Sequence, residues 1–170
     1  MERNKTETKL KLPVPSSLTS EERQEVALKA IEFIQKRSRE GKNVRGNKWS
    51  GRAGRYDPDY AKSKGVSKSG PVDLVLKDKM LNAIRYFKSK SNNNELVIGF
   101  REGSKQRNKA EGNIRGSYGN PNRAVTNKAR PFLDILKKDL LPIINDVVSK
   151  REATVKTDTG DGSSFTVRID

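Results

Sequence analysis

The chain contains neither cysteine nor histidine. Without cysteine there is no disulfide framework and no thiol nucleophile. Without histidine, the Ser-His-Asp and Cys-His types of catalysis are excluded, and so are zinc sites built on imidazole or thiolate. Carboxylates, lysine, tyrosine, serine and threonine are what remain for any chemistry.

Long apolar runs are missing as well. No stretch of about 18 apolar residues occurs, so no membrane-spanning helix is predicted. The segment 1–12 alternates charged and polar residues, which is unlike a secretory signal peptide. Hydrophobic residues make up 32% and charged residues 34% of the 170 residues. This composition is enough for one compact domain with a modest core, and we expect no membrane contact.

The carboxylate motifs that do occur are incomplete. The tripeptide DTG at 158–160 resembles an aspartic-protease motif, but only ten residues follow it, too few for the loop and flap of such a site. Asp158 and Asp161 lack the further ligands of a calcium loop. The PD dipeptide at 58–59 has no downstream acidic-x-Lys triplet to complete a nuclease motif. No phosphate-binding or dinucleotide fingerprint is present. We therefore predict no enzyme, no cofactor and no metal site.

The positive charge is concentrated in two segments of the chain. The net charge is +15. Residues 36–68 contain 11 basic and 3 acidic residues, and residues 101–130 contain 8 and 2, whereas the rest contains 17 and 16. Both basic segments are rich in Gly, Ser and Asn. Such a concentration predicts a docking surface for an anionic partner.

The order of patterns predicts one α+β domain. Residues 1–18 read as an extended N-terminal arm, either a free terminus or a strap on a neighbouring subunit. Residues 19–150 form the main domain, an antiparallel β-sheet backed by two helices, with two long basic loops. Residues 151–170 read as a C-terminal β-hairpin.

Two helices are indicated by caps and periodicity. Thr19 and Glu22 have the spacing of a capping box, and apolar residues recur at helical spacing from 26 to 34. Gly41 ends this first helix. The second helix opens at Asp139, because Pro142 is tolerated only near a helix start.

Strands are indicated by alternation of apolar and polar residues. Residues 72–76 alternate, and a helical turn follows around 78–82. Residues 83–101 read as a hairpin that turns at 92–94. At the C-terminus, residues 153–155 and 165–169 flank a glycine-containing turn, which predicts the second hairpin.

The segments 41–70 and 101–130 show neither helical nor strand periodicity. We expect them to be long basic loops that become ordered against a partner. The first also contains aromatic residues, which stack on bases or anchor protein interfaces. Three interpretations stay open: a solvated loop, an assembly interface or a nucleic-acid surface. The candidate contact residues are Trp49, Arg52, Arg55, Tyr56, Tyr60, Lys62, Lys64, Arg115 and Arg123.

Four short motifs occur in an order that resembles a known family. They are YDPDYAKSK at 56–64, PVDLVLKDKMLNAI at 71–84, LVIGF at 96–100 and ARPFL at 129–133. Together they resemble the neck, tail-completion and virion-morphogenesis proteins of tailed bacteriophages. The resemblance covers roughly residues 25–148. The chain departs from the family pattern at 77–78, where Lys-Asp replaces Thr-Gly, and in its longer, more basic stretch 101–128.

The resemblance implies a structural role in the virion neck or tail, with assembly in the host cytoplasm. Such a subunit forms a homo-oligomeric ring, sixfold or twelvefold, between the portal-side connector and the tail terminator or tube proteins. Its basic surface would face DNA in the lumen or an acidic neighbouring ring. Within the RPFL motif we expect Phe132 and Leu133 to pack the last helix onto the sheet, while Arg130, followed by Pro131, fixes the approach by hydrogen bonding. The alternatives are a free nucleic-acid-binding protein and a small metal-dependent nuclease.

Overall fold

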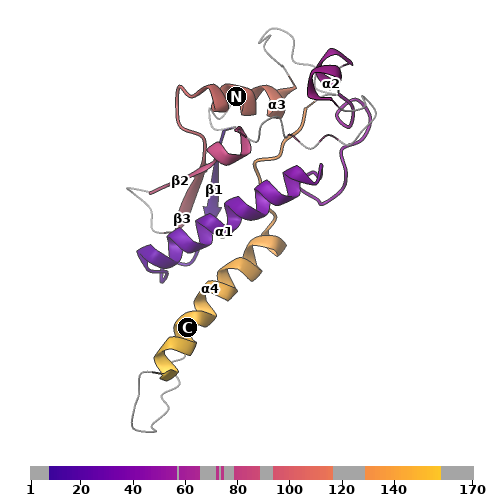
Figure 1. Cartoon of the computed structure of the whole chain (residues 1–170). Helices are drawn as coiled ribbons and strands as arrows, with labels where there is room; N and C mark the ends of the chain where they lie inside the picture. The colour runs from indigo at the N-terminus through magenta and orange to yellow at the C-terminus, as the bar shows by residue number, and fades with distance from the viewer. Residues whose placement is uncertain are drawn as a thin grey trace, which may run out of the picture.

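A computed structural model of the chain describes residues 8–56, 58–65, 72, 74, 79–88, 94–116 and 129–157, apart from the side chains of 60, 64 and 152–157. The described part is α+β, with a three-stranded antiparallel sheet and four α-helices. The predicted fold class is confirmed at this level (Figure 1). None of the helices in the described ranges is long and apolar enough to cross a membrane.

The sheet consists of β1 (Lys9–Pro13), β2 (Arg85–Phe87) and β3 (Glu95–Gly99), in the order β1-β3-β2. The predicted hairpin over residues 83–101 is confirmed, because β2 pairs antiparallel with β3. The N-terminal arm contributes β1 to the sheet of its own subunit. The expectation of a strap on a neighbour is therefore wrong for residues 9–13, and residues 1–7 lie outside the described part.

A glycine in β3 lets β1 approach closely. A Cβ atom built at Gly99 would lie 2.3 Å from the carbonyl oxygen of Thr8, which is far inside van der Waals contact. Any larger residue would push the two strands apart. This explains the glycine of the LVIGF motif, whose alternate residues Leu96 and Ile98 are fully buried.

The first helix, α1 (Ser20–Arg39), contacts β2 and β3. Its predicted capping box is confirmed: the Thr19 hydroxyl accepts from the Glu22 amide at 3.2 Å, and the Glu22 carboxylate accepts from the Thr19 amide at 2.7 Å. The last helix, α4 (Lys137–Thr157), packs against α1.

The last helix is longer than predicted. It begins two residues before Asp139 and continues through residues 153–155, which we expected to form a strand. The stretch 150–153 is rich in good helix formers, and after Pro142 no Gly or Pro occurs before residue 160, so helix propensity outweighs the weak alternation. The other half of the predicted C-terminal hairpin lies outside the described residues.

The core joins the sheet, both long helices and the RPFL motif. Phe100, which follows β3, and Phe132 of the motif are both fully buried. Their rings meet edge to face with centroids 6.3 Å apart and planes at 79°. Such an aromatic pair adds stabilisation to that of apolar burial alone. The packing role predicted for Phe132 agrees with this placement.

The two segments expected to be loops each contain a helix. In the first, α2 (Pro58–Lys64) begins with proline, which suits a first helical position. In the second, α3 (Lys105–Arg115) is capped by the Ser104 hydroxyl and ends at Gly116 with φ 72°. Both helices have few apolar residues, so hydrophobic periodicity did not predict them, whereas Ser104 and Gly116 define the two ends of α3.

Other predicted elements are only partly visible. The turn expected around 78–82 appears as a 3-10 helix, η1 (Leu81–Ala83). Of the strand predicted over 72–76, only Val72 and Leu74 belong to the described residues.

Candidate interaction surface

The described parts of the two basic segments lie at one end of the molecule. We call residues 41–65 and 101–116 the basic end; α2 and α3 belong to it, and the C-terminal end of α4 points the opposite way (Figure 1). The described residues of the basic end include twelve basic and three acidic residues. The fold thus brings together two stretches that are far apart in the sequence but share one charge sign.

Residues 41–49, at the start of the basic end, form a turn that is held by backbone hydrogen bonds. Lys42 and Lys48 form an isolated antiparallel bridge. The amide of Trp49 donates to the carbonyl of Gly41 at 3.1 Å. Between them, the Asn43 side-chain oxygen accepts from two turn amides at 2.9 and 3.1 Å. This part of the expected loop is therefore fixed within the subunit rather than by a neighbour.

Arg130 of the RPFL motif ties the rest of this loop to the core. Its guanidinium is nearly buried and donates from Nε to the Ala53 carbonyl at 2.7 Å and from Nη2 to the Arg55 carbonyl at 3.0 Å. Its own amide donates to the carbonyl of Asn113 in α3 at 2.7 Å. One residue therefore connects the motif with both basic segments.

A second buried arginine, Arg37 near the end of α1, holds the same motif from the other side. Its Nη2 donates to the carbonyls of Phe132 and Asp134, both at 2.7 Å, and its guanidinium lies 5.7 Å from the Phe33 ring centroid. Burial lowers the pKa of Arg37, while Asp134 and Asp139 oppose that shift. Nothing local in the sequence indicates this contact, because Arg37 and Phe132 are 95 residues apart.

The aromatic candidates face inward. Tyr56 is 7% exposed and packs with Ala61 and Val72 in a small satellite cluster, against which Trp49 also packs. Tyr56 therefore packs within its own subunit and Trp49 is partly buried there, while their role as anchors for a partner stays a prediction. Tyr60 belongs to α2, but its side chain lies outside the described part.

The charged candidates face outward. Arg52, Arg55 and Lys62 are exposed. Arg115 on α3 is 48% exposed and forms an ion pair with Glu111 at 3.1 Å. The side chain of Lys64 and the whole of Arg123 lie outside the described residues, as do all contacts they make. Exposed cations, not aromatic anchors, characterise the basic end.

The carboxylates show the pattern of structural ion pairs. Four have a pKa below the ordinary value, and in each the first cause is a hydrogen bond from a Lys or Arg side chain; they are Glu22, Glu40, Glu102 and Asp146. Across the described ranges, no three acidic side chains lie close enough together to hold a metal ion. Asp59, the nuclease candidate, is exposed in the first turn of α2.

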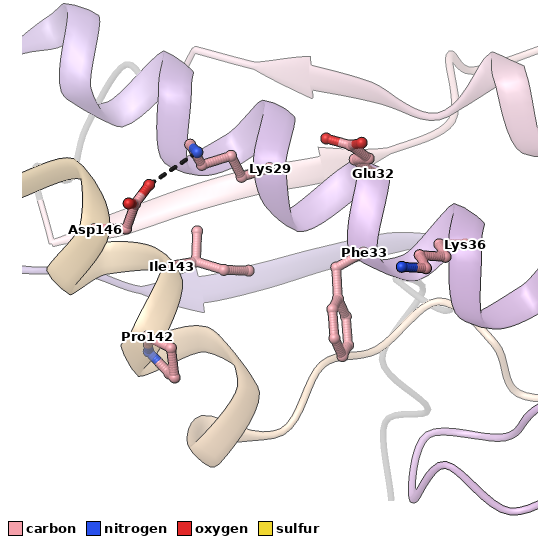
Figure 2. A pocket seen from close by; sticks show the side chains of 7 residues that line it. All are labelled: Lys29, Glu32, Phe33, Lys36, Pro142, Ile143 and Asp146. Atoms are coloured by element: carbon pink, nitrogen blue, oxygen red, sulfur yellow. Dashed lines mark ion pairs between the residues drawn. The ribbon is translucent and has the colours of Figure 1, made fainter.

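A shallow hollow lies between α1 and α4, away from the basic end (Figure 2). The Lys29–Asp146 ion pair, 2.9 Å long, spans one side of it. Phe33 and Ile143 supply its apolar surface. It contains none of the contact residues predicted from the sequence.

Comparisons of the chain with protein families, with curated proteins and with solved structures gave no match. The family resemblance therefore rests on the four sequence motifs. In the structure, residues 96–99 of LVIGF lie in the central strand β3. Phe132 of RPFL accepts a hydrogen bond from Arg37, and Arg130 of the same motif donates to the Ala53 carbonyl.

Proposed function

We propose that this protein is a structural, non-enzymatic subunit of a tailed-phage neck, where it assembles into a ring that joins the portal-side complex to the tail. Support comes first from the four motifs and their order. Two of them lie at the centre of the fold. LVIGF supplies most of β3, which pairs with both other strands, and RPFL connects the core with both basic segments. A ring of six or twelve copies, in the virion, belongs to the same proposal.

The observation that carries the proposal is the separation of a packed body from an exposed basic end. The body contains the main core cluster, whereas the basic end presents Arg52, Arg55 and Lys62 to solvent. Arg130 holds this end in place by bonding to the backbone, which leaves the neighbouring cationic side chains directed outward. A rigidly held cationic surface fits an acidic adjoining ring or the DNA that passes through a neck.

Nucleic-acid binding by a free subunit is the second candidate, and the same exposed cations favour it. Cations that neutralise phosphates release counterions, so the affinity would fall steeply with salt concentration. Replacing Arg52, Arg55 and Lys62 together by Gln would reduce both the affinity and the salt dependence. The matched control is Lys137→Gln with Lys138→Gln, two exposed lysines on α4.

Native mass spectrometry and negative-stain electron microscopy of nuclease-treated protein test the proposal. We expect closed rings of one stoichiometry that form without nucleic acid. Monomers that bind DNA with a steep salt dependence, and that never close into rings at high concentration, would instead establish the second candidate.

A further inference from the structure

The outer edge of β1 has open hydrogen-bonding positions. The backbone groups of Thr8 and Val14 bond to the strand segment around β3, at 3.0 and 2.9 Å. Antiparallel pairing alternates, so the amide and carbonyl groups of Lys9 and Lys11 point away from β3. No backbone hydrogen bond within the described part of the chain uses them. The sheet can therefore accept a fourth strand here.

The side chains at this edge restrict which strand fits. On the inner face, Leu10 is only partly buried beside the fully buried Leu12. On the outer face Lys9 and Lys11 stand in a row, and each pairs with a carboxylate of its own subunit, Lys9 with Glu102 at 3.0 Å and Lys11 with Glu95 at 3.4 Å. Pro13 lacks an amide, and a second copy of β1 would add two more lysines and a second proline, which disfavours that pairing. The edge fits a strand that is apolar on one face and polar on the other.

The chain itself contains such a segment. In residues 164–170, Phe165, Val167 and Ile169 alternate with Thr166, Arg168 and Asp170. The three apolar residues would extend the inner face beside Leu10. Thr166, Arg168 and Asp170 would lie on the outer face, where one basic and one acidic residue bring no net charge to the lysines of β1. From the sequence, residues 165–169 were predicted to pair with residues 153–155 in a terminal hairpin. Residues 153–155 belong to α4, so they cannot be the strand partner of this segment.

Helix α4 ends beyond its last described contact with the body. Its last described side-chain contact with the body is at Arg151, which bonds to the Glu22 carboxylate and donates to the Ser17 carbonyl at 3.3 Å. The helix continues six residues further, to Thr157. At 1.5 Å per residue, that is about 9 Å beyond the last contact. Figure 1 shows this end projecting past α1.

We propose that residues 164–170 of one subunit add as a strand to the free edge of β1 in the next subunit. The inference rests on the proposed function in that it names the contact between copies in the ring. The donating segment and the accepting edge are different surfaces, so the contact runs head to tail. Head-to-tail contacts close into rings when the rotation per subunit allows.

Hydrogen exchange measured by NMR on the full chain tests the contact at single residues. On assembly we expect the Lys11 amide to exchange at least about tenfold more slowly. The amides of Leu10 and Leu12 already bond to β3, so they report that the sheet is folded. Arg168→Pro removes a backbone amide from the middle of the donated strand and should abolish both the slow exchange at Lys11 and the ring. Arg168→Ala keeps the amide and should preserve both.

A complementation experiment separates donor from acceptor. Lys11→Pro blocks the accepting edge without breaking a bond to β3, whereas Arg168→Pro blocks the donated strand. Each variant alone should stay monomeric. When unlabelled Lys11→Pro is added to labelled Arg168→Pro, the Lys11 amide of the labelled chain should become protected, and pairs rather than rings should form.

Two results overturn this inference. One is a ring that still forms in Arg168→Pro with an unprotected Lys11 amide, which would leave the proposed function intact. The other is slow exchange at Lys11 in dilute wild-type monomers, which would show that the segment folds back onto its own sheet. Failure of the wild type to form rings under any condition would instead contradict the proposed function itself.

Discussion

The body and the basic end of this molecule are stabilised in different ways. The body consists of the sheet, α1, α4 and the RPFL motif, and its buried residues are apolar apart from a few polar and charged ones. The basic end adds Ala110 of α3 to the main core, has a small satellite cluster around Tyr56, and otherwise depends on backbone turns and on Arg130. The stabilisation from apolar burial is roughly proportional to the buried area and is shared by the whole core. Hydrogen bonds from a single side chain stabilise only the segment that they reach. Damage to the body should therefore unfold the subunit, while damage at Arg130 should loosen only one end.

The largest effect is expected in the body, at Phe132. Phe132→Ala removes a fully buried ring that packs edge to face on Phe100, and it should lower the free energy of unfolding by about 3–5 kcal/mol. Urea unfolding followed by circular dichroism measures the loss. Leu141→Ala, at a residue that is 44% exposed on α4, is the control and should change stability by less than about 0.5 kcal/mol. Equal stability of the Phe132 variant and wild type would refute the placement of the motif in the core.

The next effect is at Arg37, which joins the body to the motif. Arg37→Met keeps most of the side-chain volume but removes the buried guanidinium that donates to the carbonyls of Phe132 and Asp134. The expected loss is about 1.5–3 kcal/mol, measured by the same unfolding transition. Arg39→Met is the control, because Arg39 bonds at the surface to Asn82. If both variants lost the same small amount, the buried contacts of Arg37 would have no special role.

A smaller and local effect is expected at Arg130. Arg130→Met removes the donors to the carbonyls of Ala53 and Arg55, so amides over residues 50–56 should exchange faster. Amides of β3 should keep their rates, because Arg130 does not bond to the sheet in the described structure. Hydrogen exchange with mass-spectrometric readout follows both regions at once. Equal acceleration in both regions would show that the basic end is not a separate unit.

The smallest effect concerns pH and the Glu22 carboxylate. The hydrogen bond from Arg151 is the first cause of its lowered pKa, burial opposes it, and the bond to the Thr19 amide adds to the lowering. When the folded-state pKa of a carboxylate is lower than its unfolded-state pKa, its ionised form stabilises the folded protein. This stabilisation is fully present at a pH above the unfolded-state pKa, and it is lost as the pH falls through the folded-state pKa. Wild type should therefore exceed Glu22→Gln in stability at pH 7 by about 0.5–1 kcal/mol. The difference should vanish in acid, and thermal melts at several pH values check this.

The body was largely predictable from the sequence because its signals are local. The capping box at Thr19, the apolar spacing of α1 and the hairpin over 83–101 each depend on neighbours within a few residues. The basic end was not, because its structure depends on contacts between distant segments. Arg130 and Ala53 are 77 residues apart, and no periodicity records such a bond.

The helices missed by sequence analysis had signals of another kind. Ser104 and Gly116 mark both ends of α3, but between them only Ala110 and Ile114 are apolar. The extension of α4 had no capping signal at all; it follows from helix-forming residues that continue past 150. Reading caps before periodicity would have found α3 and left the C-terminal strand 153–155 in doubt.

The central claim is that the body folds within one subunit while the basic end takes part in the assembled neck. Hydrogen exchange of the free subunit and of the assembled ring, compared for β3 and for α2 and α3, tests it most directly. We predict that β3 is equally protected in both states and that α2 and α3 exchange more slowly in the ring than in the free subunit. Equal exchange of α2 and α3 in the two states would contradict the claim.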